Sequence, residues 1–202
     1  MLRKEAIEEI LSYYYNEYNR VFACFDFSEK ADRFTEENQT VNFCRAVKEK
    51  YPQAVTWYEH PFVGEDGTKR FDAVVYIKEI NSLLIVEAKC LRKHSKYEAM
   101  YNDLERICKY KNRDISIFGA ANPTVYAVIL ADHWYKTHGI YYTDLLRNWK
   151  QGCVDACRPE EKKFSDFMDK AAAEIMEPHW AVKDFSSQYK NYHLLTMIGK
   201  VR

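Results

Sequence analysis

The chain has 202 residues, which is enough for one compact domain with its own hydrophobic core. Its 30 basic and 30 acidic side chains leave no formal net charge, which argues against a protein that coats nucleic acid through a bulk basic excess but allows a local basic groove. The six cysteines are scattered, the start has no apolar signal region, and no run is long enough to span a bilayer. These features predict a cytoplasmic protein with free thiols and no membrane partner.

Two helices are expected before the first strand. Over residues 4–19, apolar side chains recur at the spacing of one helix face, and the tyrosines among them fit packing better than chemistry. A second helix begins near Thr35, a good N-cap, and ends at Tyr51-Pro52, because proline disfavours a helical conformation in the residue before it. Glu36 and Glu37 fall in its first turn, where acids also complement the helix dipole.

Three strand candidates separated by short turns follow, so we expect an antiparallel meander. They cover residues 54–62, 70–78 and 83–90. Residues 96–111 predict a helix, and the continuous apolar run 124–131 is typical of a strand buried on both faces and reached by a crossover through that helix. The rest of the chain predicts two helices and two segments that suit either strands or an ordered tail: residues 140–149, 160–176, 180–185 and 192–201.

The residues that most suggest chemistry lie on the second and third strands. Glu87 and Lys89 share one face of the third strand, because side chains alternate along a strand. A turn at residues 79–82 closes the hairpin, and a two- or four-residue loop places Asp72 opposite Glu87 or Lys89 on that same face. The sequence therefore predicts two carboxylates and an ammonium side by side at one end of an apolar strand pair.

Two buried carboxylates repel one another, and such pairs are usually tolerated because a cation joins them. Carboxylate oxygens suit Mg²⁺ or Mn²⁺, and these ions also bind phosphate oxygens and water. The sequence contains no Gly-rich phosphate loop and no Gly-x-Ser-x-Gly segment, which argues against an NTPase and against a serine hydrolase of that type. An ordinary salt bridge at a solvated strand end is the alternative interpretation of the three residues.

The segments Phe71-Asp72 and Ile85-Val86-Glu87-Ala88-Lys89 resemble the signature of the PD-(D/E)xK nuclease superfamily, although phenylalanine stands where the nominal motif has proline. The resemblance implies a restriction-endonuclease-like α/β fold, with an αβββαβ core and a mixed sheet flanked by helices. The expected order of elements matches that core over about residues 35–131. We therefore expect one nuclease-like domain over residues 1–202, with an N-terminal helix and C-terminal additions outside the core.

The resemblance also implies a Mg²⁺- or Mn²⁺-dependent endonuclease that hydrolyses phosphodiester bonds, with DNA as the expected substrate. Asp72 and Glu87 would hold the ion, and the backbone carbonyl of Ala88 would complete its shell. Lys89 would orient the attacking water and stabilise the negative charge that develops on phosphorus. Many members of the superfamily dimerise to cut both strands, so a homodimer is a possible partner.

The superfamily often carries an acidic residue in its first core helix. Here Glu37 or Glu36 would supply it, and Glu37 is favoured because an acid followed by asparagine and a nearby threonine resembles that helix in some members. This acid would bind a second ion or the attacking water.

Substrate contacts are expected from basic residues that follow the motif. Between Lys89 and Arg113, eight basic side chains stand against three acids, an excess that would attract a phosphate backbone without reading bases. For any single lysine of this stretch a solvated helix face is the better interpretation. Arg92, Lys93 and Lys96 lie closest to the motif and rank first as substrate-binding residues.

Two other function classes stay open. The first is a catalytically inactive nuclease-fold module that binds nucleic acid or protein. The second is a structural protein whose tyrosine-rich surface mediates self-association. A zinc site from Cys153 and Cys157 with His133, His138 or His179 is a weaker interpretation than structural thiols, because the cysteine spacing is not Cys-x-x-Cys.

Overall fold

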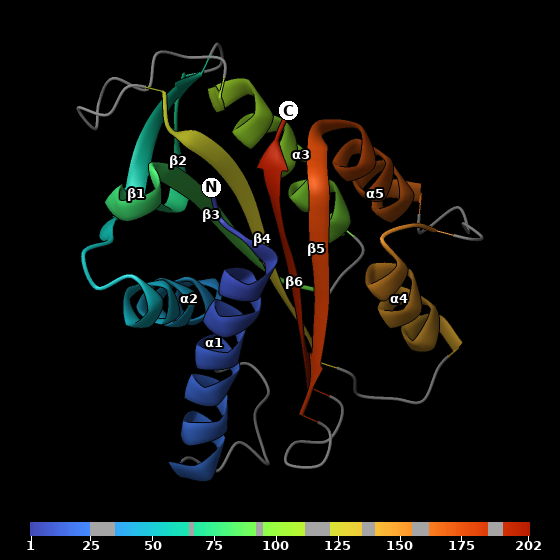
Figure 1. The fold of residues 1–202 in the computed structure, drawn as a ribbon. Helices are drawn as coiled ribbons and strands as arrows, with labels where there is room; N and C mark the ends of the chain where they lie inside the picture. Colours follow the sequence, from blue (N-terminus) through green and yellow to red (C-terminus); the bar gives the residue numbers. More distant parts are fainter. Residues whose placement is uncertain are drawn as a thin grey trace.

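The structure is a computed structural model. It describes residues 1–24, 35–64, 67–91, 95–111, 122–134, 140–154, 162–185 and 192–202. Within these residues the chain forms one six-stranded mixed sheet with helices on both faces (Figure 1). The fold class is therefore α/β, as the sequence predicts.

The elements follow the expected order along the chain. The helices in the described part are α1 (Lys4–Cys24), α2 (Glu36–Lys50), α3 (Ser95–Lys111), α4 (Ile140–Gln151) and α5 (Lys162–Glu174). The strands are β1 (Val55–Gly64), β2 (Gly67–Ile77), β3 (Ser82–Cys90), β4 (Thr124–Trp134), β5 (Ile175–Asp184) and β6 (Tyr192–Val201), and a 3₁₀ turn at Lys78–Ile80 joins β2 to β3. All five predicted helices are confirmed, and the two segments left open between strand and tail belong to β5 and β6.

The sheet has the strand order β1-β2-β3-β4-β6-β5. Strands β1, β2 and β3 form the antiparallel meander that the short turns predict, and β4 pairs parallel with β3 after the chain crosses over through α3. The sequence of elements from α2 to β4 is thus helix, three strands, helix, strand. Because β3 and β4 are parallel neighbours, their carboxyl ends lie at the same edge of the sheet.

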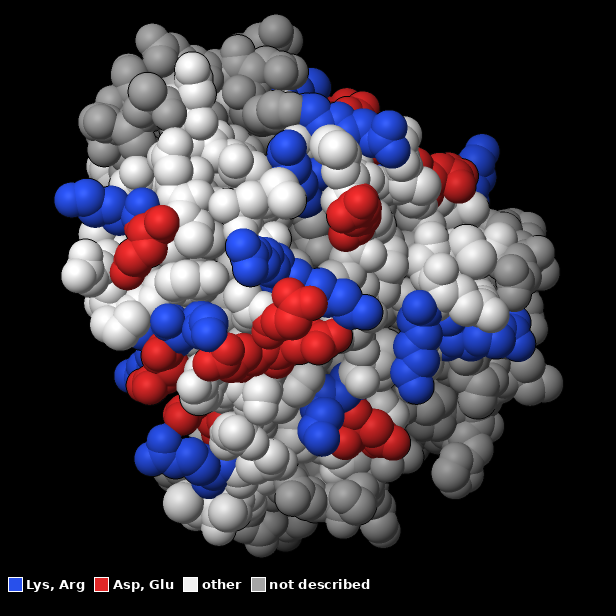
Figure 2. All heavy atoms as spheres, viewed as in Figure 1, with Lys and Arg blue, Asp and Glu red and all other residues white. Residues whose placement is uncertain are grey.

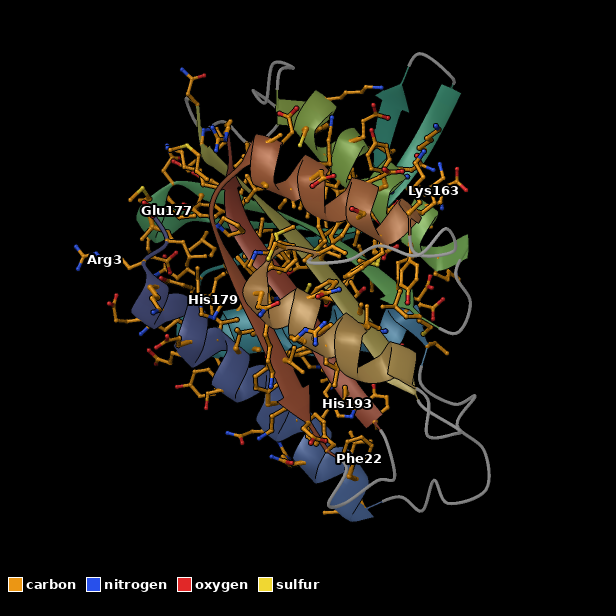
Figure 3. All side chains as sticks on the ribbon, turned by 90° about the vertical axis from the view of Figure 1, so that its right-hand side faces the viewer. Arg3, Phe22, Lys163, Glu177, His179 and His193 are labelled. Carbon is orange, nitrogen blue, oxygen red and sulfur yellow. The ribbon has the colours of Figure 1, made fainter. Side chains whose placement is uncertain are left out.

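Two apolar layers sandwich the sheet. Helices α1 and α2 pack on one face against Leu84 and Val86, whereas α3, α4 and α5 pack on the other face against Leu83 and Ile85. Figure 3 looks onto the layer that carries α4 and α5. Since both faces are covered, every residue of β3 is buried, which explains its continuous apolar pattern. Among the described helices, none is long and apolar enough to cross a membrane.

Strand β6 lies inside the sheet and pairs antiparallel with both β4 and β5. At Gly199 of β6, an added Cβ would overlap the side chain of Ile175 on β5. A bulge in β5 between Met176 and His179 adjoins the same place. The glycine is therefore required by the packing of the two strands, and not by an unusual backbone conformation.

Helix α2 is fixed at both ends by local hydrogen bonds. The Thr35 side chain accepts a hydrogen bond from the Asn38 N–H at 3.4 Å, and the N–H of Tyr51 donates to the carbonyl of Val47 at 2.8 Å. These bonds satisfy groups that a helix leaves unpaired at its ends.

Candidate active site

The β2–β3 hairpin brings Asp72 level with Glu87. The pairing of the two strands ends with Ala73 opposite Val86, so the next residues, Asp72 and Glu87, lie opposite one another in one of the two predicted registers. Asp72 Oδ2 accepts a hydrogen bond from the backbone N–H of Ala88 at 2.7 Å. The Asp72 carboxylate is thereby held against the end of β3.

Helix α3 adds two charged side chains one turn apart, Asp103 and Arg106. Asp103 Oδ2 lies 2.7 Å from Lys89 Nζ, and Asp103 Oδ1 lies 2.9 Å from Arg106 Nη2. Arg106 Nη2 also forms an ion pair with Glu87 Oε1, while Glu87 Oε2 lies 3.7 Å from Lys89 Nζ. These four residues form a closed ring of alternating charge, hereafter the charge ring, in which Glu87, Lys89 and Asp103 are buried.

The backbone beside the charge ring is also tied to α2. Gln39, which is fully buried, donates from Nε2 to the carbonyl of Lys89 at 3.4 Å and to Cys90 Sγ at 3.7 Å. Lys89 Nζ in turn donates to the carbonyl of Ala88 at 3.0 Å. The end of β3 is therefore positioned by α2 on one face of the sheet and by α3 on the other.

The electrostatics of the site are those of crowded carboxylates. Burial, with repulsion from Asp103 and Asp72, raises the pKa of Glu87 to about 8. Burial also raises the pKa of Asp72, although the hydrogen bond from Ala88 opposes the shift. Burial lowers the pKa of Lys89, but the carboxylates of Asp103 and Glu87 outweigh it, so the net direction is upward. The pKa shifts thus favour the charged form of Lys89 and the protonated form of Glu87.

Two carboxyl groups at the end of the hairpin are of the ligand type that hard divalent cations prefer. Asp72 and Glu87 offer carboxylate oxygens, and Mg²⁺ commonly binds through one or two carboxylates while water and substrate phosphate fill the rest of its shell. The described residues contain no group of three or more His, Cys, Asp or Glu side chains arranged to hold a metal. The predicted third ligand, the Ala88 carbonyl, accepts a hydrogen bond from Lys89.

The acid that α2 brings to this end of β3 is Glu36. Glu36 Oε1 accepts a hydrogen bond from the N–H of Cys90 at 3.0 Å and lies 2.9 Å from Lys96 Nζ. Glu37 is exposed, and a hydrogen bond with the Thr35 side chain lowers its pKa at the helix start. The preference for Glu37 is thus corrected: successive residues of a helix point about 100° apart, and only Glu36 faces the strand.

Of the three basic residues ranked first for substrate binding, Lys96 lies in the described part of the chain and Arg92 and Lys93 lie outside it. The ammonium of Lys96 forms an ion pair with Glu36, and the Lys96 side chain is 40 % exposed to solvent. Lys96 is therefore close to the end of β3 and open to solvent, while its charge already has a partner.

Sequence reasoning counted Asp103 and Arg106 only among the charged residues that follow the motif, and it did not place them beside Glu87 and Lys89. Asp103 borders the apolar stripe that Met100, Leu104 and Ile107 form on α3, and Arg106 lies one turn further along the helix, beside Asp103. A charged residue at the border of such a stripe points toward the sheet, where it needs a partner of opposite charge. Their spacing of three residues, which makes them neighbours on the helix, was the available signal.

The other sequence candidates do not gather at one place. Cys153 is exposed, and Cys157 and His138 lie outside the described residues. His133 on β4 pairs with His193 of β6. His179 on β5 pairs with Ile198, on the other edge of β6 and farther along that strand. Figure 3 shows His179 and His193 well apart along the sheet. In the described residues, the proposed zinc ligands therefore do not converge.

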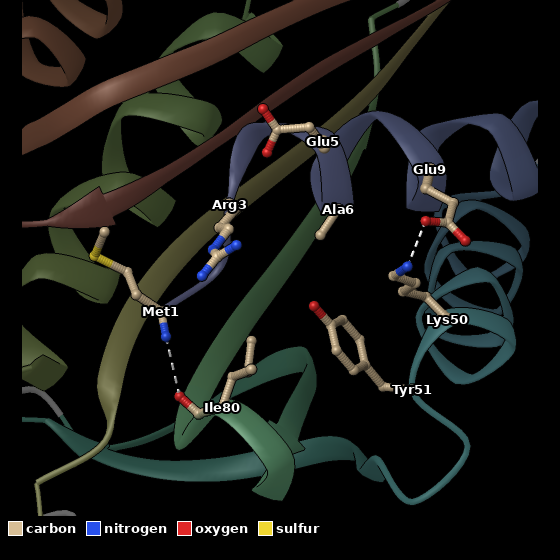
Figure 4. Close-up of a pocket in the computed structure, with 8 residues that line it drawn as sticks. All are labelled: Met1, Arg3, Glu5, Ala6, Glu9, Lys50, Tyr51 and Ile80. Carbon is tan, nitrogen blue, oxygen red and sulfur yellow. Dashed lines mark hydrogen bonds and ion pairs between the residues drawn. The ribbon is translucent and has the colours of Figure 1, made fainter.

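A surface pocket lies at the other end of β3 (Figure 4). It is lined by residues from the start of the chain and α1, from the end of α2 and from the 3₁₀ turn after β2, including Arg3, Glu9, Lys50, Tyr51 and Ile80. Glu9 and Lys50 form an ion pair at its side. Ile80 precedes β3, whereas Glu87 and Lys89 lie at its carboxyl end, so this pocket is separate from the charge ring.

Acidic and basic side chains are interspersed on the face of the molecule that Figure 2 shows, which carries α1 and β5, as the zero net charge predicts. Comparison with protein-family models, with curated proteins and with solved structures finds no match for the chain.

Proposed function

We propose that the protein is a metal-dependent nuclease of the PD-(D/E)xK type that hydrolyses phosphodiester bonds in DNA. The observation that supports this most is the meeting of Asp72, Glu87 and Lys89 at the end of one hairpin. Asp72 lies level with Glu87, and Lys89 Nζ lies 3.7 Å from Glu87 Oε2. Two carboxylates and a charged amine at one buried edge are the groups that this chemistry requires.

In this proposal Asp72 and Glu87 hold Mg²⁺ or Mn²⁺, and Glu36 lies close enough to the end of β3 to orient water. The bound ion would polarise the phosphate and acidify a water molecule. Lys89 provides a permanent positive charge beside the reacting phosphate, because Asp103 keeps its ammonium protonated and in place. A second copy of the chain would supply a second centre for cutting both strands of a duplex.

A second candidate is a nuclease-fold module that binds nucleic acid or protein without cutting. The observation in its favour is that both carboxylate oxygens of Glu87 already face cationic side chains, Arg106 and Lys89. The charge ring thus balances most of its own charge without an ion. The two candidates differ in one property, namely whether a divalent cation binds and supports cleavage.

The test is cleavage of plasmid DNA, single-stranded DNA and RNA with Mg²⁺, with Mn²⁺ and with EDTA. Lys89→Ala should lower the rate by at least about 100-fold, while the matched control Lys109→Ala, which removes an exposed lysine from the outer side of α3, should cut like wild type. Cleavage of RNA alone would change the substrate class. If the folded wild type cuts none of the three substrates with either ion, the nuclease proposal is wrong and the binding module is the better function.

A further inference from the structure

Arg106 occupies a position that a bound cation would need. Its Nη2 contacts Glu87 Oε1 and lies 2.9 Å from Asp103 Oδ1. Its guanidinium carbon lies 5.5 Å from the centre of the ring of Phe71, the residue that precedes Asp72. The guanidinium therefore holds one of the two predicted carboxylate ligands from the α3 side.

The contacts of Arg106 are incomplete in one respect. Its Nε is buried and has no hydrogen-bond acceptor among the described residues, although a guanidinium carries five N–H donors. The side chain as a whole is 19 % exposed, whereas Nε itself is buried, so solvent reaches the guanidinium only at its other atoms. A planar guanidinium with an unused donor matches two oxygens of a phosphate, the geometry that arginine recognises better than lysine does.

The local charge count favours an exchange of partners. When all three carboxyl groups of Asp72, Glu87 and Asp103 are ionised, they carry three negative charges against the two positive charges of Lys89 and Arg106. This crowding, together with burial, raises the pKa of Glu87 to about 8. A divalent cation alone would turn the net charge of the ionised groups positive, and a cation together with one phosphodiester would balance it. Arg106 can leave Glu87 without losing Asp103, because that pair lies within one helix turn.

We propose that Arg106 is an exchangeable counter-ion of Glu87: it covers this carboxylate in the metal-free protein and moves to a phosphate of the nucleic acid when a divalent cation binds. The proposal rests on the proposed function, since it assumes the same metal site and a phosphodiester substrate. It makes Arg106 a substrate-binding residue that also sets metal affinity. It requires cation and nucleic acid to promote each other's binding, because each relieves a cost imposed by the other.

The experiment measures Mn²⁺ binding, with free Mn²⁺ followed by electron paramagnetic resonance, in wild type, Arg106→Gln and Lys109→Gln. Both variants remove one positive charge from α3, but only Arg106 contacts Glu87. We expect Arg106→Gln to bind Mn²⁺ about tenfold more tightly than wild type and Lys109→Gln to stay within about twofold of it. An oligonucleotide with hydrolysis-resistant linkages should tighten Mn²⁺ binding to wild type and have much less effect on Arg106→Gln.

Two outcomes would overturn the proposal. One is Mn²⁺ binding to Arg106→Gln that is no tighter than binding to Lys109→Gln, and the other is an equal effect of the oligonucleotide on wild type and Arg106→Gln. If the glutamine variant is unstable, Arg106→Lys takes its place in the test. It keeps the charge but loses the planar fork, and we expect it to fold and to bind Mn²⁺ with intermediate affinity. Asp72→Asn separates the two claims: if it abolishes Mn²⁺ binding while Arg106→Gln changes nothing, the metal site stands and only the exchange fails.

Discussion

Replacing Asp103 with asparagine perturbs the charge ring at the residue that joins its two cations. Asp103 is 5 % exposed and lies 2.7 Å from Lys89 Nζ and 2.9 Å from Arg106 Nη2. Removing one partner of a buried ion pair usually costs roughly 3–5 kcal/mol. Glu87 still faces both cations and is freed from the repulsion of Asp103, so we expect the free energy of unfolding to fall by about 2 kcal/mol.

Urea unfolding at neutral pH measures this change, and a melting curve should show a drop of roughly 4–8 °C for a domain of this size. The matched control is Glu105→Gln, on the same helix, whose ion pair with Lys109 at 3.5 Å is exposed to solvent. We expect this variant to lose no more than about 0.5 kcal/mol. Equal losses in the two variants would refute the view that the charge ring is a buried network whose members depend on one another.

Three further predictions address parts of the fold that surround the site. Gly199→Ala should lower the free energy of unfolding by about 2 kcal/mol, because the new methyl group would overlap Ile175, and an unchanged urea midpoint would contradict this. Thr35→Ala should cost about 1 kcal/mol through loss of the α2 cap, Thr35→Ser should restore most of it, and an equal loss in both variants would count against capping. Burial and the charge on His193 lower the pKa of His133 to about 4 from 6.5, so its contribution to stability is present above pH 6.5 and is lost as the pH falls toward 4. His133→Gln should therefore remove about 2 kcal/mol of the acid destabilisation seen in melting curves between those pH values, and parallel curves would show that His133 is not the titrating group.

The sequence was informative about the site wherever local geometry decides the outcome. Alternation along a strand puts Glu87 and Lys89 on one face, and a short hairpin loop leaves few registers for Asp72. The structure adopts one of the two predicted registers. The same local reasoning predicted where α2 begins, because a threonine N-cap satisfies the helix end with atoms three residues away.

The residues that were missed or misplaced depend on how a helix is rotated about its own axis. Glu36 and Glu37 are neighbours in sequence, yet packing of α2 on β3 turns only one of them toward Cys90. Asp103 and Arg106 look like solvated charges until α3 is docked on the sheet, which buries Asp103 beside Lys89 and brings Arg106 to Glu87. A helix rotation is set by the whole apolar layer, which no short segment of sequence encodes.

The position of β6 has a consequence for how the chain is made. Strand β4 keeps one edge unpaired until Tyr192–Val201 has left the ribosome. In the part of the chain that the structure describes, β5, the strand made before β6, pairs with β6 alone. At translation speeds of about 5–20 residues per second, the apolar strand β4 spends several seconds with an open edge. The nascent chain is therefore exposed to association with other chains during that interval, and we expect its yield to depend on how quickly the last strand is synthesised and on a chaperone that shields β4.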